Sequence, residues 1–152
     1  AKQLTEKRLE IIHTESMTQG ITSLISFLEN ESIESNLKRI KETLDDLKWG
    51  EITEATRSGN YKNVSYSSGD IIGFSEGILV TASKNPVDCV INLLEHIAPE
   101  SESICTLYYG FGAEKEEVKE ISAIIESSWP DVELELIDGG HPVYRYMLAI
   151  EE

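Results

Sequence analysis

The chain has 152 residues, which suits one domain, or one domain with part of a neighbour, and leaves little room for two. Its composition, 40% hydrophobic and 27% charged, is that of a folded chain and argues against disorder. The formal net charge is −15, and residues 63–152 hold 4 basic and 17 acidic side chains, which disfavours nucleic-acid binding because such a surface repels phosphates.

The N-terminal residues read as the end of something larger. Residues 1–9 resemble the tail of a helix without a capping signal, and the sequence opens on Ala1 rather than Met, as an excised piece of a longer protein would. They lack the apolar core of a signal peptide, and no run approaches the roughly 20 apolar residues of a membrane helix. We therefore expect a cytoplasmic protein without a membrane span.

A strand that runs straight into a helix is predicted next. Residues 10–14, "EIIHT", are the strand candidate. The helix follows in "ESMTQGITSLISFLEN", where apolar residues recur at helical spacing. These residues are Met17, Ile21, Leu24, Ile25 and Leu28.

The clearest helix lies in "SIESNLKRIKETLDDLKWG". Its apolar residues form one stripe, Ser32 or Asn30 can cap it, and Gly50 is the expected terminator. A stripe of this kind is typical of core packing and not of a cofactor site.

From Glu51 the pattern becomes β-rich. We expect a strand over residues 51–59, a turn at Gly59 and Asn60, and two short strands within residues 69–83, joined at residues 75–77. The remaining elements are predicted as a helix after Asn85 and Pro86 that ends before Pro99, a strand at 103–110, a helix at 113–129 stopped by Pro130, and strands at 131–137 and 143–151. In the last strand Tyr144 and Tyr146 are expected on the same face.

The order β-β-β-α-β-α-β-β from residue 51 predicts an α/β (α+β) fold, a single mixed sheet with helices packed mainly on one face. Residues 1–30 fall outside that pattern. We therefore expect residues 1–30 to be the end of an upstream α/β lobe, residues 31–49 a connecting helix, and residues 50–152 a C-terminal mixed-sheet lobe.

No motif in the sequence assigns a catalytic or metal-binding role. A phosphate-binding G-x-x-x-x-G-K-[ST] and a G-x-G-x-x-G are both missing, and the G-x-S-x-G match in "GFSEG" joins two predicted strands, whereas a nucleophile elbow joins a strand to a helix. Cys89 and Cys105 stand in apolar surroundings and are expected to be buried free thiols. Among the three histidines, His141 has the best position for a site, since it lies between two glycines and Pro142.

Two loops at strand ends remain as candidates. In "HTESMTQG", Ser16 or Thr14 can cap the following helix, or the free N–H groups can hold a carboxylate or phosphate. In "DGGHPVY", the paired glycines can serve a close approach to a ligand, or simply turn the chain between two strands. Both interpretations of each loop stay open at this point.

Nearly the whole chain resembles the C-terminal region of the large, kinase subunit of bacterial fatty acid kinase. The resemblance is carried by the order of five segments: "HTESMTQGITSLISF", "GEITEATRSG", "GDIIGFSEGILV", "LYYG" and "DGGHPVYRYMLAIE". That group is often labelled dihydroxyacetone-kinase-like, or the DAK phosphatase family. The resemblance covers nearly the whole chain and implies a fold like that of DegV-type fatty-acid-binding proteins. It departs from those carriers at the end, where "GGHPVYRY" places bulky tyrosines.

The resemblance implies a non-catalytic domain that docks a DegV-type fatty-acid-binding protein, whose bound acyl carboxylate is phosphorylated elsewhere in the full-length protein. ATP and Mg²⁺ are implied for that other part, with no cofactor here, and a homodimer is kept open as the assembly. The alternatives are a module that itself binds a fatty acid or small carbonyl compound, and an enzyme of the dihydroxyacetone kinase or phosphatase type. The expected partner- or ligand-binding residues are Ser16, Met17, Gln19, Gly20, Gly139, Gly140, His141, Pro142, Tyr144 and Tyr146.

Overall fold

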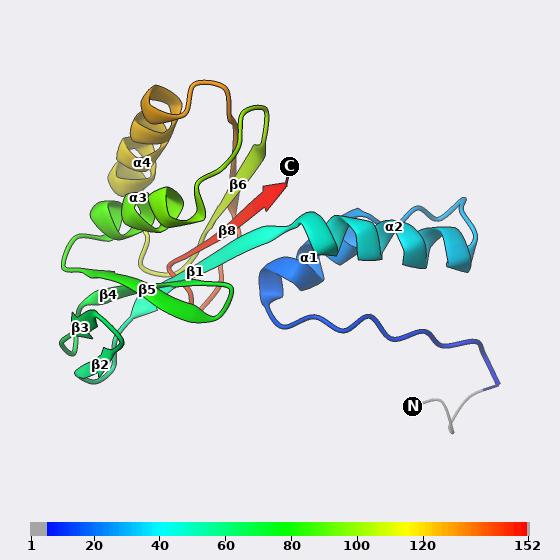
Figure 1. Cartoon of the computed structure of the whole chain (residues 1–152), viewed down its shortest axis with the longest axis horizontal. Helices are drawn as coiled ribbons and strands as arrows, with labels where there is room; N and C mark the ends of the chain where they lie inside the picture. Colours follow the sequence, from blue (N-terminus) through cyan, green and yellow to red (C-terminus); the bar gives the residue numbers. More distant parts are fainter. Residues whose placement is uncertain (1–5, 152) are drawn as a thin grey trace.

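The computed structural model describes residues 6–151, which form a mixed sheet with helices on both of its faces (Figure 1). The helices are α1 (Met17–Ile25), α2 (Ile33–Asp46), α3 (Pro86–Ile97) and α4 (Lys115–Ser128). The strands are β1 (Lys48–Glu54), β2 (Gly59–Tyr61), β3 (Val64–Tyr66), β4 (Ile71–Ser75), β5 (Ile78–Ser83), β6 (Ile104–Tyr109), β7 (Glu133–Asp138) and β8 (Tyr146–Glu151).

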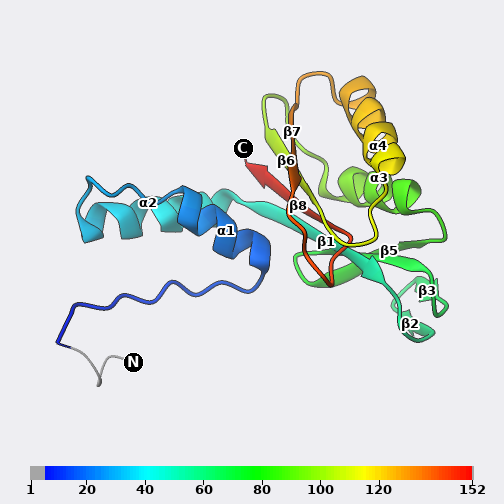
Figure 2. The same cartoon turned by 180° about the vertical axis from the view of Figure 1, so that it is seen from behind.

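Six strands make the main sheet, in the order β5-β4-β1-β8-β6-β7. All neighbours are antiparallel except β6 and β7, which are parallel and are joined through α4. The final strand β8 lies inside the sheet, between β1 and β6 (Figure 2). This arrangement confirms the predicted mixed sheet.

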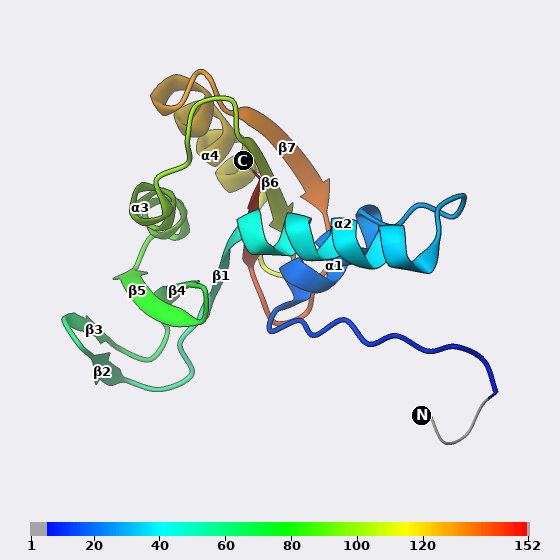
Figure 3. The ribbon, with the colours of Figure 1, turned by 45° about the vertical axis from the view of Figure 1, so that its right-hand side comes forward.

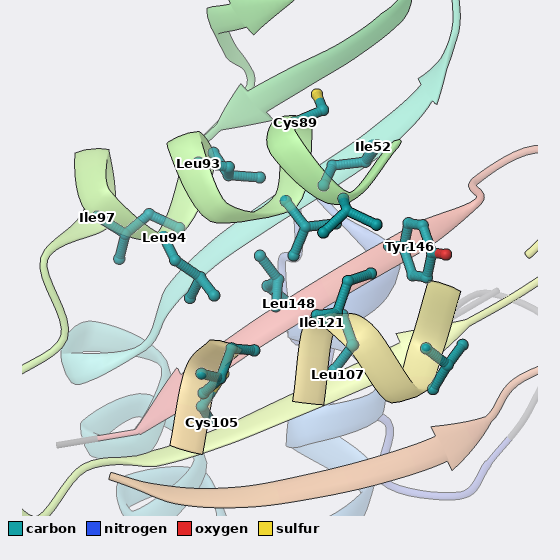
Figure 4. Packing of buried hydrophobic residues seen from close by; sticks show 14 of the residues in the cluster. Ile52, Cys89, Leu93, Leu94, Ile97, Cys105, Leu107, Ile121, Tyr146 and Leu148 are labelled. Carbon is teal, nitrogen blue, oxygen red and sulfur yellow. The ribbon is translucent and has the colours of Figure 1, made fainter. Parts of the chain in front are cut away.

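The larger core lies between the sheet and the helices α3 and α4 (Figure 4). Leu93 and Leu94 of α3 and Ile121 of α4 meet Leu107 of β6 and Leu148 of β8, and all five are almost fully buried. Helix α3 begins as predicted: the Asn85 side chain caps it by accepting a hydrogen bond from the Val87 N–H, and Pro86 is its first residue. Burial of this apolar surface is the main stabilising contribution to the fold.

The opposite face of the sheet carries α1 and α2 (Figure 3). Trp49 of β1 and Met147 and Ala149 of β8 form a second, smaller core there. Ile21 of α1 and Leu44 of α2 pack against it. The Ser32 side chain caps α2, as predicted, by accepting a hydrogen bond from the Ser35 N–H. Within residues 6–151 no helix is long and apolar enough to cross a membrane.

The prediction for the N-terminal segment is wrong where the structure tests it. Residues 6–14 contain neither the helix tail nor the strand at 10–14. "EIIHT" finds no strand to pair with among the described residues, and a strand without a partner leaves its backbone groups unpaired. Residues 1–5 lie outside the described part of the chain.

The boundaries after α2 also differ from the prediction. Gly50 does not end the helix but lies inside β1, where a Cβ would come within 2.8 Å of Leu93, so its missing side chain lets α3 approach the sheet. Gly59 and Asn60 are not a turn but lie in β2, which pairs with β3 in a hairpin turned at Lys62 and Asn63. Lys62 has a positive φ of 52°, a turn signal that glycine usually carries.

The last strand begins three residues later than expected. Because residues 141–145 form a turn and not a strand, the two-residue alternation is broken there. Tyr146 enters the larger core, whereas Tyr144 packs against the smaller core on the opposite face. The expectation that the two tyrosines share one face is therefore wrong.

Candidate functional site

The two predicted loops meet at Glu51, a residue that the sequence reasoning missed. Glu51 lies in the middle of β1, buried under α1 and beside the turn at 141–145. Burial raises the pKa of its carboxyl, and hydrogen bonds from the Tyr144 hydroxyl and the Met17 N–H, together with the nearby His141 side chain, oppose that rise. An acidic residue inside the buried stretch "WGEI" is the sequence signal that could have identified it.

The N-terminus of α1 is closed by hydrogen bonds within its own first turn. The Ser16 Oγ accepts a hydrogen bond from the Gln19 N–H at 3.1 Å, and the Gln19 side-chain oxygen accepts one from the Glu15 N–H at 2.6 Å. Met17 faces Glu51 with its N–H, and a side chain at Gly20 would meet no atom within 4 Å. Ser16 and Gln19 thus cap this end of the helix.

His141 organises the turn before β8. Its Nδ1 accepts hydrogen bonds from the N–H groups of Tyr144, at 2.9 Å, and Val143, at 3.2 Å. Because Nδ1 is an acceptor in both contacts, the neutral ring carries its proton on Nε2. The imidazole also stacks on the Tyr144 ring, with centroids 5.1 Å apart. In this arrangement His141 acts as a turn-stabilising residue.

The turn is fastened to the end of β6. The Phe111 N–H donates to the His141 carbonyl and the Gly110 N–H to the Arg145 carbonyl, both at 2.8 Å. A Cβ at Gly110 would lie 2.6 Å from the His141 carbonyl and would also clash with the Tyr144 carbonyl, so only glycine fits. Gly139 donates to the Tyr109 carbonyl, and Gly140 has a positive φ of 55°. Pro142 is exposed at the tip.

A charged group supports the same turn from the side of α4. Arg145 Nη2 donates to both carboxylate oxygens of Glu117, at 2.7 and 2.8 Å, and the Tyr146 hydroxyl donates to the same carboxylate at 2.9 Å. Burial would raise the pKa of Glu117, but these two donors outweigh it and hold the pKa below its usual value. The arrangement joins α4 to the start of β8. Sequence reasoning identified Tyr146 and missed Glu117 and Arg145.

Two large apolar side chains stand out from this frame. Phe111 is 80% exposed and Val143 is 64% exposed. The Phe111 N–H donates to the His141 carbonyl, while the Val143 N–H donates to His141 Nδ1 and the Val143 carbonyl accepts a hydrogen bond from the Thr53 hydroxyl. A rigid frame that presents exposed apolar side chains suits contact with another protein.

The cysteines and the possible metal ligands of the described residues can be placed directly. Cys89 and Cys105 are buried free thiols, as predicted, and burial raises the pKa of each to about 12. Across residues 6–151 no three histidine, cysteine or acidic side chains gather in a way that could hold a metal ion. Among the predicted residues, Met17 at α1 and His141 and Tyr144 at the turn lie around Glu51, while Tyr146 lies on the other side of the sheet with Glu117.

One family and several relatives match this chain. The family is described as FakA-like, the C-terminal part of a type of fatty acid kinase subunit, and it matches residues 1–151. An uncharacterized protein of Staphylococcus saprophyticus is 32% identical over 99% of the chain, and the protein YloV of Bacillus subtilis is 24% identical over the same share. The chain spans 27% of the length of each of these relatives.

Solved structures with the same fold are DegV family proteins. The match to one from Corynebacterium glutamicum has a TM-score of 0.56 and 12% identity, and covers 89% of this chain and 60% of that one. A fatty-acid-binding DegV family protein from Streptococcus agalactiae gives a TM-score of 0.51 and 8% identity, with 88% and 54% covered. At such identity the likeness shows the fold alone, and it bears out the predicted DegV-like architecture.

Proposed function

The chain belongs to the FakA-like C-terminal family of fatty acid kinase subunits, and on that premise we propose that it is a non-catalytic domain that docks a DegV-type fatty-acid-binding protein. The docked partner presents its acyl carboxylate to an ATP- and Mg²⁺-binding part elsewhere in the full-length protein. The contact surface consists of Phe111, Val143 and the neighbouring residues of the turn, Gly140, His141 and Pro142.

The observation that carries this proposal is the exposed pair Phe111 and Val143 on a hydrogen-bonded frame. Apolar side chains at the centre of an interface contribute most when the backbone beneath them is already ordered, because little conformational entropy is then lost on binding. The frame is ordered by Gly110 and by the Glu117–Arg145 ion pair. Both features favour a protein contact at the turn before β8.

The polar groups of the two loops support docking over the binding of a small ligand. Ser16, Gln19 and His141 each accept a hydrogen bond from a nearby backbone N–H group, which fixes the orientation of the side chain within its own turn. The buried Glu51 carboxylate between the loops would also repel an incoming acid.

The test measures binding of a lipid-loaded DegV-type protein to the full-length kinase subunit. We expect Phe111→Ser and Val143→Ser each to weaken binding by roughly tenfold, which is about 1.4 kcal/mol. Ile78→Ser is the control, since Ile78 is exposed by 46% but lies on the edge strand β5. Binding that is equally strong in all three variants would rule out this surface.

The ligand-binding alternative is tested on the same protein. Native mass spectrometry of the purified full-length subunit is expected to show no acyl chain held by this domain. A fatty acid that copurifies and is lost in the variant Gln19→Ala would favour the alternative, because Gln19 lies in the first turn of α1 and not on the docking surface.

A further inference from the structure

Helix α1 is unusual for a helix on the surface of this domain, because it buries polar side chains and exposes large apolar ones. Its buried residues are Thr18, Thr22 and Ser23. Leu24 and Ile25 are 77% and 67% exposed. A surface helix normally turns its apolar stripe inwards. Of the stripe that the sequence predicts as buried, Ile21 packs against the smaller core, whereas Leu24 and Ile25 remain largely exposed in the described part of the chain.

The segment before α1 shows the same lack of a partner. Residues 10–14 have the sequence of a strand, and Ile11 and Ile12 are exposed, yet no strand among the described residues pairs with them. In Figure 1 this segment runs alongside α1 and α2 and away from the sheet. A segment with a strand pattern, followed by a helix with exposed apolar side chains, is typical of a β-α unit that belongs to another sheet.

Two grooves join the segment to the helices. The larger, of about 560 Å³, has an apolar lining of Ile11, Ile12, Leu37, Ile40 and Leu44, and a polar lining of His13, Glu15, Gln19, Lys41 and Asp45. The other, of about 250 Å³, shares Ile12 and Ile40 and continues to Leu24 and Phe27. The uncovered apolar surface is thus continuous from the segment to α1. We call it the α1 surface, made of Ile11, Ile12, Leu24, Ile25 and Phe27.

We propose that the α1 surface is covered by the part of the full-length protein that precedes this chain in its relatives. The contact is made within one polypeptide, and residues 10–14 pair as a strand with the sheet of that preceding part. The relatives are much longer, since the chain spans only 27% of them, and the matching family is described as C-terminal. The DegV-like structures also extend well beyond the matched region. The sequence predicts that residues 1–30 end an upstream α/β lobe, and the proposal adds the interface between that lobe and this domain. The proposal does not depend on the docking role.

Cysteine labelling of the full-length protein tests the proposal. Leu24→Cys is made in that protein, and the rate of maleimide labelling at position 24 is followed by peptide mass spectrometry, with Ile25→Cys as a second variant. Cys89 and Cys105 are buried and contribute little background. We expect labelling at both positions to be at least tenfold slower than at Ile78→Cys, the exposed control on β5.

The same experiment separates the other occupants. Protection must persist at low protein concentration and without any DegV-type protein. Protection that fades on dilution would assign the surface to a second copy, and protection that appears only after a DegV-type protein is added would assign it to that partner; either result overturns the proposal. Labelling as fast as at position 78 under all conditions overturns it too.

Strand pairing of residues 10–14 has a separate readout in the same protein. Hydrogen exchange of the Ile11, Ile12 and His13 amides is expected to be at least a hundredfold slower than that of the exposed connection at residues 29–31. Equal exchange rates in the two segments would contradict the pairing.

Discussion

Gly110 is the residue on which the turn before β8 depends most directly. The carbonyls of His141 and Tyr144 occupy the space that a Cβ would need, and both belong to backbone that cannot rotate away. We expect Gly110→Ala to reduce the free energy of unfolding by about 2 kcal/mol, as overpacking does elsewhere, measured by urea denaturation.

The control for this change is Gly20→Ala. Gly20 lies within α1, and an added methyl there meets nothing within 4 Å. Because alanine is the better helix former, this substitution should be neutral or stabilise by up to about 1 kcal/mol. If both alanines destabilised the protein equally, the close approach at Gly110 would not be the cause.

Glu117 makes the stability of the turn depend on pH. Its folded-state pKa is held below the usual value by Arg145 and Tyr146, in spite of burial. The stabilisation is complete above the unfolded-state pKa, near 4.3, and is lost as the pH falls through the lower folded-state pKa. Glu117→Gln should therefore cost about 1–2 kcal/mol at neutral pH and less in acid.

Urea denaturation of both proteins over roughly pH 3 to 7 measures this difference. Glu116→Gln, an exposed neighbour in the same helical turn, is the matched control. A deficit in Glu117→Gln that stays constant down to the lowest pH would argue against the ionised carboxylate as its source.

At the scale of elements, the turn at 141–145 is stabilised by a side chain and not only by the glycines that precede it. The Nδ1 of His141 accepts two backbone N–H groups, so removing it leaves two donors without a partner. We expect His141→Ala to destabilise the protein by about 1 kcal/mol. His141→Asn should recover most of the loss, since its side-chain oxygen is attached to Cγ as Nδ1 is.

Thermal unfolding, together with hydrogen exchange of the Tyr144 amide, measures this effect. Faster exchange in the alanine variant and near-normal exchange in the asparagine variant are the expected results. If asparagine behaved like alanine, stacking on Tyr144, and not the hydrogen bonds, would be the main contribution of His141.

Elements with local signals were predictable from the sequence, and elements that depend on distant neighbours were not. Helix α3 carries its own cap and proline, and it begins where predicted. Residues 10–14 have a strand pattern but no partner among the described residues, so pattern alone could not decide their state. The hairpin of β2 and β3 was missed because its turn is at Lys62 and Asn63, residues without a glycine signal.

The candidate site was predictable in its loops but not in its connections. Glycines and a histidine in sequence marked the turn, and Ser16 marked the cap. Glu51, Gly110 and Glu117 come from three distant parts of the chain, and only the register of β1, β8 and β6 brings them to the turn. Such contacts depend on the topology of the sheet, which periodicity does not encode.

At the scale of the whole molecule, charge should govern how fast a partner arrives. Residues 63–152, which include the proposed docking surface, carry 17 acidic and 4 basic side chains. A partner with a basic face would be steered towards this surface, and salt would screen that attraction. Raising the ionic strength from about 0.05 M to about 0.5 M should lower the association rate roughly tenfold and leave the dissociation rate nearly unchanged.

Stopped-flow measurement of association with a lipid-loaded DegV-type protein would check this. An association rate that does not depend on salt would show that the acidic surface serves solubility and not recognition. The apolar contacts of Phe111 and Val143 would then have to account for binding alone.

The place of β8 inside the sheet affects how the protein is made. β8 fills the gap between β1 and β6, and Trp49 finds its pair only when Ala149 arrives. While a ribosome is still adding residues before Tyr146, β1 and β6 have emerged but cannot join, and the apolar side chains destined for both cores stay in contact with water. The sheet can therefore close only after β8 has been made, and such distant pairing folds slowly. Until then the nascent chain is a natural client for chaperones that shield exposed strands.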